Sequence, residues 1–464
     1  MAAWKKIGTR LGVGALIALC AFVVFIGPWP TYGPGFRNQE YFRQSLAALD
    51  AANRGAPAGA PGLLKAGWGA ADITPPAGVP LAGFGGRKGR PSTGAHDPLK
   101  VKALAFHDGR NTVLLFGSDL LLVPDPVAAA VRKAVSAEAR IAPNSLLFSA
   151  SHTHSGPGGL APGLVARAFA GAYDPRVPEL LIRSFTAAAL EAVRSLRPAK
   201  MAVGSVDAGA FVRNRTRQAE VDPDLQFARI EQENGKICHL VRFSAHPTVL
   251  GEDNFQFSAD YPGYLQAAIE QATGGMTIYM GGAVGSMSSR GAPGSGFERA
   301  RALGEQLAQL VLAGSGPGLP FQDRVPVDFI GGNILLPPFQ VRILNPGWRI
   351  SPLLGRLLGI PGYAWIQAVR IGDLVLFGVP GDFSGEISNS WKSWASRRNI
   401  ALWPTSFCGS YGGYISPDRY YSEMMDSKGN IAYETGLMSW CGPDQEAYFT
   451  ALMQHMVEAV TGRK

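Results

Sequence analysis

Apolar and polar residues alternate along this chain with two different periods, and each change of period marks the boundary of an element. Short apolar runs bounded by Gly, Pro or Asp predict strands, whereas apolar positions that recur every three or four residues predict helices. The predicted strands cover 100–106, 112–123, 145–151, 201–206, 227–231, 237–244, 277–281, 327–335 and 365–379. The predicted helices cover 38–54, 126–140, 178–194, 261–272 and 297–313. Because hairpin turns such as Glu233-Asn234-Gly235 accompany the helices, the mixture predicts an α/β fold of mixed sheets layered with helices.

The N-terminal segment has a different pattern. Residues 11–30 carry no charge and follow Lys5, Lys6 and Arg10, which is typical of a secretory signal peptide or an uncleaved signal anchor. The run ends in Pro28-Trp29-Pro30 instead of a small-residue cleavage site, so we favour an anchor, with Trp29 and Tyr32 at the membrane interface. Both interpretations place the rest of the chain on the extracytoplasmic side of a membrane.

The stretch 55–62 is rich in Gly, Ala and Pro and has the composition of a linker. The chain is therefore expected to have three parts. Residues 1–36 form the signal anchor or signal peptide, residues 37–63 form a short helix and linker, and residues 64–464 form a single large domain.

Composition and charge limit the kinds of partner that this chain could bind. The net charge of +8 is spread over isolated Lys and Arg residues, without the basic stripe interleaved with aromatics that nucleic-acid binding requires. A mildly basic surface instead suits anionic lipid or an acidic substrate. An exported location permits a disulfide between Cys408 and Cys441, and CxxC pairs of the zinc-binding type are absent.

The segment 343–363 is apolar, is interrupted by Pro and Gly, and carries only Arg349 and Arg356 as charges. Two interpretations stay open. It is either a buried connection or an apolar rim that receives a lipid chain or touches a bilayer.

Candidate chemistry centres on LLFSASHTHSGPGG at 146–159, an apolar strand that ends in two histidines one residue apart. Strand side chains alternate between faces, so His152 and His154 are expected on one side, where they could bind a metal or a developing oxyanion. A histidine at a strand end can also merely cap backbone carbonyls. Two further apolar strands end in polar side chains, His246 and Asp382, and open α/β sheets build their sites at such strand ends. The tyrosine-rich stretch 411–421 could add a phenol.

These motifs occur in a recognisable order. SHTHSGPGG is followed by NRT at 214–216, AHPT at 245–248, FSADYPGY at 257–264, VPGDF at 379–383 and YxxYIS at 411–416. ADITPP at 71–76, GAHDPLKVKALAF at 94–106, Tyr433-Glu434 and Gly442-Pro443 extend the pattern. Over residues 66–450 the chain resembles the catalytic domain of the neutral ceramidases.

The resemblance implies a zinc site and assigns roles by position. His152 and His246 match imidazole ligands, Asp382 matches a glutamate ligand, and Tyr414 matches a tyrosine that also reaches the metal. His154 and Arg215 match residues that stabilise the oxyanion, Ser288 matches the catalytic serine, and His96 matches a position near the substrate.

The chain also departs from the family pattern. Asp382 is one methylene shorter than glutamate, and the family's Asn-x-Gly-Asp-x-Ser-Pro motif is replaced at 283–289 except for its Gly and Ser. We see no C-terminal immunoglobulin-like domain of the kind that the family carries. These differences indicate a divergent branch, with another amide as an alternative substrate.

The expected function is that of a zinc-dependent amidase. It would hydrolyse the N-acyl bond of ceramide or a related N-acyl lipid to a fatty acid and a sphingoid base, with a membrane as its partner and with protein partners undetermined. Ser288 would be either a nucleophile or a ligand for the substrate's hydroxyl. One alternative is a membrane-tethered lipid-binding protein with a degenerate site. Another is a sulfatase-like hydrolase, since 286–290 faintly resembles the sulfatase motif without its Pro.

Overall fold

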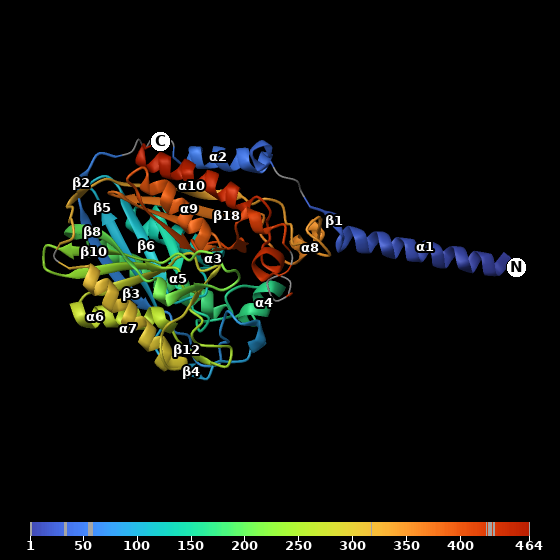
Figure 1. Cartoon of the computed structure of the whole chain (residues 1–464), viewed down its shortest axis with the longest axis horizontal. Helices are drawn as coiled ribbons and strands as arrows, with labels where there is room; N and C mark the ends of the chain where they lie inside the picture. The colour runs from blue at the N-terminus through green and yellow to red at the C-terminus, as the bar shows by residue number, and fades with distance from the viewer. Residues whose placement is uncertain are drawn as a thin grey trace.

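A layered body carries one projecting helix, α1 (Ala2–Phe25), in the computed structural model (Figure 1). The structure describes residues 2–31, 35–53, 59–316, 318–423, 425, 429 and 432–463, and of residues 2–9 it describes the backbone alone. Tyr32 and residues 55–58, the first half of the expected linker, lie outside the described residues. The prediction of a single α/β domain with mixed sheets is confirmed.

The larger sheet has eight strands in the order β13-β11-β10-β8-β3-β5-β6-β7. It is antiparallel in the middle, whereas β6–β7 and β11–β13 at its two ends are parallel pairs. The sheet curls until β13 lies against β6 and β7. The strands are β3 (Lys65–Asp72), β5 (Lys100–His107), β6 (Thr112–Ser118), β7 (Leu146–Ala150), β8 (Arg197–Asp207), β10 (Asp224–Gln232), β11 (Ile237–Phe243) and β13 (Met276–Gly281).

The smaller sheet has four strands in the order β16-β18-β19-β21. They are β16 (Val327–Leu335), β18 (Tyr363–Ile371), β19 (Leu374–Val379) and β21 (Ala401–Ser406). The single strand expected at 365–379 is wrong, because Gly372, with φ of +66°, turns the chain into the β18–β19 hairpin. The strand expected at 112–123 likewise ends early, at Ser118.

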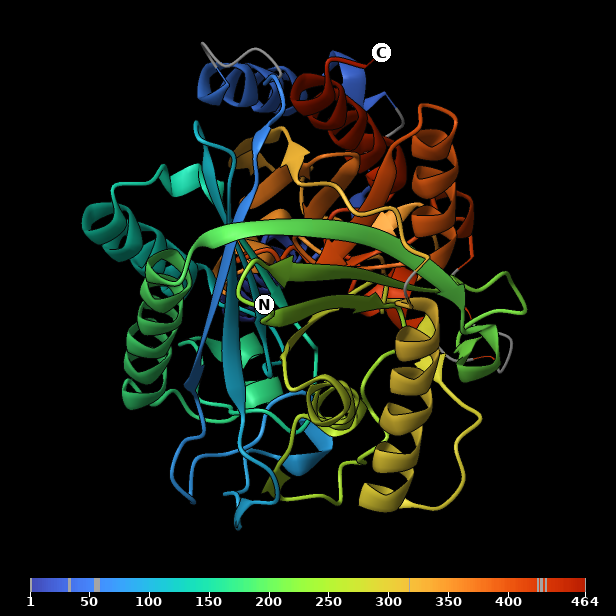
Figure 2. The same ribbon diagram turned by 90° about the vertical axis from the view of Figure 1, so that its left-hand side faces the viewer.

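Helices cover both sheets (Figure 2). α3 (Asp125–Ala139) and α5 (Arg176–Arg194) bury one apolar core against the larger sheet, and α6 (Asp260–Thr273) and α7 (Gly296–Gly314) bury another. α2 (Glu40–Ala52) and α10 (Gln445–Thr461) pack on the smaller sheet, and α9 (Gly385–Ser396) packs beside β21. A further core fills the space between the two sheets.

Five of these helices were predicted, and four helices were not. α4 (Leu164–Ala170) and α8 (Pro352–Leu357) are too short to show a helical period. α9 is rich in Ser, a weak helix former, and is stabilised by burying Ile387, Trp391 and Ala395 at four-residue spacing. α10 has a regular buried face but was also missed.

Short strand pairs connect the layers. They are β1 (Trp29–Pro30) with β17 (Trp348–Arg349), β2 (Gly62–Leu63) with β15 (Arg324–Val325), β4 (Gly94–Ala95) with β12 (Gln256–Phe257), β9 (Val212–Asn214) with β14 (Met287–Ser289), and β20 (Asp382–Phe383) with β22 (Tyr414–Ile415). The β20–β22 register sets Asp382 opposite Tyr414.

All four cysteines are free thiols, so the Cys408–Cys441 disulfide that an exported location permits is not formed. Cys238, Cys408 and Cys441 are buried, whereas Cys20 is exposed on α1.

The N-terminal segment joins the body through its end near Pro30. Ser351 donates its hydroxyl to the carbonyl of Val24, and β1 pairs with β17. Against the expectation of a transmembrane anchor at 11–30, no helix among the described residues is both long and apolar enough to cross a membrane.

Candidate active site

His152 stands two residues beyond β7 in a backbone conformation that is rare for a residue with a side chain, with φ of +67°. Its Nδ1 lies 2.6 Å from the carbonyl oxygen of Leu121. A carbonyl can only accept a hydrogen bond, so Nδ1 carries the proton and Nε2 keeps a free lone pair. The ring of Phe407 stacks on the imidazole at 4.3 Å and fixes its plane. His152 therefore presents a lone pair in a set direction.

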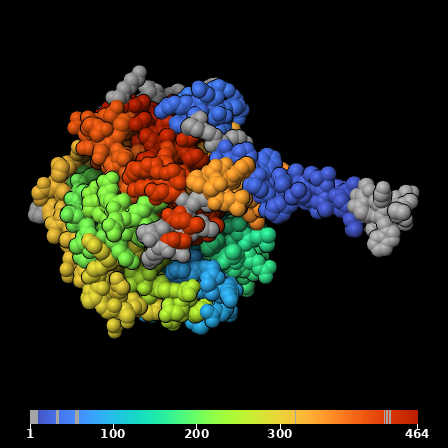
Figure 3. Space-filling view, turned by 45° about the vertical axis from the view of Figure 1, so that its right-hand side comes forward, coloured from blue at the N-terminus to red at the C-terminus, as the bar shows by residue number. Residues whose placement is uncertain are grey.

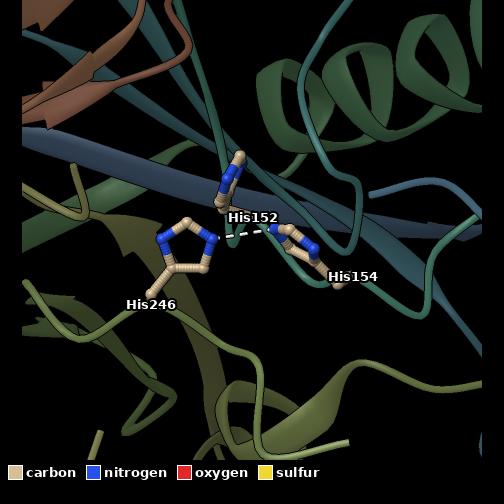
Figure 4. Close-up of side chains that lie close together, drawn as sticks. All are labelled: His152, His154 and His246. Carbon is tan, nitrogen blue, oxygen red and sulfur yellow. Dashed lines mark hydrogen bonds between the residues drawn. The ribbon is translucent and has the colours of Figure 1, made fainter. Parts of the chain in front are cut away.

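His246 follows β11 and is oriented by the same device. Its Nδ1 lies 3.1 Å from the carbonyl oxygen of Val284, so its Nε2 also keeps a lone pair. That Nε2 lies 2.8 Å from Nε2 of His154 (Figure 4). The three histidines that follow two separate strands converge on one point.

His154 is packed against residues 83–87, which lie outside the histidine cluster. A Cβ added to Gly83 would lie 2.5 Å from the imidazole, and the Phe84 ring lies 4.6 Å from it, centroid to centroid. The buried guanidinium of Arg87 donates to the backbone carbonyl of His154. The Nδ1 of His154 is buried without a hydrogen-bond partner.

Burial keeps the imidazoles of His154 and His246 neutral. Desolvation, together with nearby positive charge, holds the pKa of both His154 and His246 well below the usual value for histidine. Neutral imidazoles are the form that ligates metal ions.

Asp382 opens β20 and is 1% exposed. Its Oδ2 accepts a hydrogen bond of 2.7 Å from the Tyr411 hydroxyl, whereas Oδ1 has no hydrogen-bond donor. Oδ1 lies 3.1 Å from Nε2 of His152. With the His152 proton on Nδ1, two buried acceptor atoms face each other, which is costly unless a cation lies between them.

The donor set fits a metal ion of the zinc type. The ligand atoms of His152, His154 and His246 all lie within 4.8 Å of one another. Imidazole nitrogens beside a carboxylate are typical ligands of zinc and related transition metals. The unpaired Oδ1 of Asp382 and the two lone pairs on His152 and His246 are the atoms such an ion would satisfy.

Tyr414 and Arg215 lie beside this cluster. The Tyr414 hydroxyl accepts a hydrogen bond of 3.0 Å from Nη2 of Arg215. Arg215 also donates to the carbonyl of Gly285 at 2.7 Å and to Glu434 at 3.2 Å. Although burial opposes it, the proximity of Tyr414 and Glu434 raises the pKa of Arg215, which stays cationic. Burial raises the pKa of Glu434 to about 7, against the influence of Arg215.

The structure places Ser288 and His96 differently from the others. Ser288 is half-buried in β14, pairs with Arg213, and forms a backbone bridge with His246. His96 stacks on Phe297 at 3.7 Å and lies 2.9 Å from an oxygen of Asp97. Neither is among the residues that line the cavity beside the histidines.

That cavity has a volume of about 400 Å³. His152, His154, Asp382, Tyr411 and Tyr414 line one part of it. The remaining wall is largely apolar and includes Leu121, Leu122, Leu160, Val165, Phe169, Leu358, Ile360, Met438 and Trp440. The polar cluster therefore opens into a space suited to a long apolar group.

Several residues that hold the site residues in place were not predicted from the sequence. Tyr411 carried a signal, since it opens the YxxYIS motif, but only the second tyrosine was chosen. Glu434 belongs to the Tyr433-Glu434 motif, but its contact with Arg215 was not predicted. Phe407 and Arg87 gave no local signal for their roles, because each contacts a histidine far away in the sequence. Ser286 stands at the position of the family's Asp and donates to Glu386 at 2.8 Å, so a carboxylate from α9 lies beside this loop.

The sequence and the fold of this chain are both similar to those of known ceramidases. Residues 64–292 match the family described as neutral/alkaline non-lysosomal ceramidase, N-terminal. A neutral ceramidase of Mycobacterium tuberculosis is 24% identical over 240 residues, which is 47% of this chain. The match spans 38% of that relative's length.

Two solved structures share the fold. The crystal structure of the neutral ceramidase from Pseudomonas aeruginosa superimposes with a TM-score of 0.71 at 19% identity, over 86% of this chain and 74% of that one. A ceramidase complexed with C2 gives a TM-score of 0.71 at 18% identity, over 86% of this chain and 75% of that one.

Proposed function

This chain is a divergent member of the neutral/alkaline ceramidase family, and from that premise we propose that it is a zinc-dependent amidase. Its substrate is ceramide or a related N-acyl lipid, which it hydrolyses to a fatty acid and a sphingoid base. The observation that carries the proposal is the convergence of unprotonated acceptors, Nε2 of His152, Nε2 of His246 and Oδ1 of Asp382, beside a largely apolar cavity.

His152, His246 and Asp382 would hold the metal, with the Tyr414 hydroxyl beside them. A bound zinc ion supplies Lewis acidity, which polarises a carbonyl and makes water more acidic. Tyr411 holds the Asp382 carboxylate by its second oxygen, so that Oδ1 stays directed at His152.

His154 is suited to donate a proton to the oxygen of the scissile carbonyl. Its Nε2 lies 2.8 Å from the Nε2 lone pair of His246, so the proton of neutral His154 resides on Nε2. Once the His246 lone pair is engaged by a ligand, that N–H is free for a substrate oxygen. The loss of one such donor typically slows an acyl-transfer reaction by about 10²- to 10³-fold.

Arg215 contributes through Tyr414. Its guanidinium donates to the phenol oxygen at 3.0 Å and keeps a positive charge near the developing oxyanion. Ser288 enters the proposal through the family pattern and its backbone bridge to His246, as a nucleophile or as a ligand for the substrate's hydroxyl. His96 keeps a substrate-proximal role only as a prediction from the same pattern.

The proposal is tested by fatty-acid release from an N-acylsphingosine, with His246→Ala as the site variant and His107→Ala as the matched control. His107 is half-buried and hydrogen-bonds Thr112, away from the cavity. We expect chelator-sensitive release by the wild type and the control, and neither release nor bound zinc in His246→Ala. A folded, zinc-free wild type that binds the lipid without cleaving it would favour the lipid-binding alternative.

We also propose that the uncharged run at 11–30, which follows Lys5, Lys6 and Arg10, directs export of the chain. Fractionation of expressing cells tests this. Resistance of the chain to added protease in intact spheroplasts would contradict it.

A further inference from the structure

We propose that the mouth of the active-site cavity is a docking surface for an anionic lipid bilayer, so that substrate enters the cavity directly from the lipid. The proposal rests on the proposed function and names the partner that the same site engages. Three observations support it: the exposure, the position and the charge of the residues around the mouth.

Several large apolar side chains near the mouth of the cavity are exposed to solvent. Tyr363 and Tyr433 line the cavity and are 48% and 41% exposed. Leu164, Leu357 and Leu437 are each one residue from a lining residue and are 67%, 70% and 51% exposed. Several large exposed apolar side chains around one opening are unusual on a soluble protein and indicate a binding surface. We call these five residues the mouth ring.

The mouth ring comes from three segments that are distant in sequence. Leu164 begins α4, Leu357 ends α8, and Leu437 ends the π-helical turn η6 (Tyr433–Leu437). Convergence of three separate segments on one opening makes the apolar surface a feature of the fold. The segment 343–363, for which two interpretations were open, therefore forms an exposed rim in part.

The charges on these segments select the kind of lipid. Within 160–170 and 343–363 the charged residues are Arg167, Arg349 and Arg356, all of them basic. Arg356, next to Leu357, is exposed. Arg167 is also exposed and lines a neighbouring depression together with the exposed Lys88, whereas Arg349 is buried. Of the acidic residues near the mouth, Glu434 of η6 is buried, and Asp125, which lines the cavity, is half-buried and accepts a hydrogen bond from Ser410. Exposed arginines among apolar side chains complement a negatively charged lipid surface.

The apolar surface continues into α1. α8 lies against α1. Ser351, the N-cap of α8, donates its hydroxyl to the carbonyl of Val24 in α1 and its backbone N–H to the carbonyl of Ile26, one residue beyond α1. Figure 3 shows α1 in blue leaving the body beside the orange segment that carries α8, with the teal segment that carries α4 below it. The described side chains of α1 are exposed and largely apolar, including Leu11, Ile17 and Phe25 at 70%, 63% and 51%. A bilayer is the one surface that covers α1 and the mouth ring together.

The first test does not depend on catalysis. A polarity-sensitive fluorophore is attached at Leu357→Cys, and for the control at Leu63→Cys, in a Cys20→Ser background where the other three cysteines are buried. Leu63 is 61% exposed and lies in β2, at the end of the body opposite α8 (Figure 1). The probe is vesicles of phosphatidylcholine containing a quarter of phosphatidylglycerol. We expect a blue shift at position 357 and none at 63. No shift at 357, or equal shifts at both positions, would overturn the proposal.

The second test links the mouth to turnover. The triple variant Leu164→Ser, Leu357→Ser and Leu437→Ser is compared with Leu63→Ser on two substrates, N-acylsphingosine in the same vesicles and a short-chain, water-soluble analogue. We expect the kcat/KM of the triple variant on vesicles to fall by about tenfold or more, with the soluble substrate changed by less than about twofold. Equal losses on both substrates would contradict a docking role. A wild type that cleaves neither substrate would contradict the proposed function, while the fluorescence result would still decide the docking surface.

The charge argument has its own measurement. Arg167→Gln with Arg356→Gln should weaken vesicle binding when phosphatidylglycerol is present and leave binding to pure phosphatidylcholine unchanged. An equal effect on both vesicle types would remove the anionic-lipid part of the proposal.

Discussion

At the residue scale, the site depends on which nitrogen of each histidine carries the proton. The carbonyls of Leu121 and Val284 fix the Nδ1 protons of His152 and His246, and this directs both Nε2 lone pairs inward. Asp382 is directed by Tyr411 in the same way, through one oxygen. The atoms that we propose as metal ligands are thus oriented by the protein itself, which would lower the free-energy cost of binding an ion.

Tyr411→Phe tests this positioning. It removes the hydroxyl that donates to Oδ2 of Asp382 at 2.7 Å and leaves the ring in place. Loss of such an outer hydrogen bond typically weakens metal binding by about 10- to 100-fold. Zinc affinity is measured by competition with a chromophoric chelator, with Tyr173→Phe, an exposed tyrosine, as the control. Unchanged affinity in Tyr411→Phe would show that Asp382 does not contact the metal.

Arg87 is a positioning residue for His154. It is 1% exposed and donates to the backbone carbonyls of Ala82, His154, Gly251 and Glu252. Burial without a carboxylate in hydrogen-bond contact lowers its pKa to about 10, so the guanidinium is still charged at neutral pH.

Arg87→Met should leave several buried carbonyls without a donor and cost about 3 kcal/mol or more of unfolding free energy. Arg90→Met, at a nearby exposed arginine, should change it by less than about 0.5 kcal/mol. Urea denaturation followed by tryptophan fluorescence measures both. Similar stabilities for the two variants would contradict the role of Arg87.

At the element scale, the site requires that the larger sheet curl until its two ends meet. β7 delivers His152 and His154, and β13 lies against it at Gly281. A Cβ on Gly281 would lie 2.5 Å from the carbonyl oxygen of Ala150, which is closer than real side chains approach. Glycine is therefore required where the two ends touch.

Gly281→Ala should force β13 and β7 apart. We expect a loss of about 1 to 3 kcal/mol in unfolding free energy, together with weaker zinc binding, because His152 follows two residues after Ala150. Gly318→Ala has open space around it and serves as the control. A Gly281→Ala protein with unchanged stability and zinc affinity would mean that β13 does not set the position of β7.

The pattern of apolar and polar residues predicted the helices and strands well, but it did not predict the contacts between them. The strands that precede His152 and His246, and helices α3 and α5 to α7, were predicted because each has a clear apolar period. Asp382 was predicted at a strand end, although the hairpin before it was read as one strand. The pairing of Asp382 with Tyr411 and of Arg215 with Glu434 could not be predicted, since side-chain hydrogen bonds between distant segments leave no periodic trace. The free state of Cys408 and Cys441 likewise depends on tertiary placement.

At the scale of the whole molecule, one buried histidine links stability to pH. His239 lies in the middle of β11, is fully buried, and has no hydrogen-bond partner on either ring nitrogen. Its neighbours on the adjacent strands are Arg229 and Thr277. Desolvation, with a smaller contribution from Arg229, lowers its pKa to about 4.

The unfolded chain binds a proton at His239 near pH 6.5, whereas the folded chain does so only near pH 4, so stability is lost as pH falls between these values. Integration gives a loss of about 3 kcal/mol across this range. His239→Leu should remove that part of the pH dependence, and His107→Leu should retain it. Urea denaturation at pH 7 and pH 4.5 measures the difference. An equal pH slope in the two variants would contradict the assignment.

Three features of the whole molecule lie next to one another: a cluster of side chains suited to a metal ion, a largely apolar cavity and an exposed apolar mouth. The central claim is that the cluster holds zinc and that zinc is used to cleave an N-acyl bond. The most direct measurement is fatty-acid release from an N-acylsphingosine by metal-free protein titrated with zinc. We predict that release rises linearly and saturates at about one zinc per chain, as expected for a single catalytic site. Release that is full without metal, or that stays absent in protein shown to bind one zinc per chain, would contradict the account.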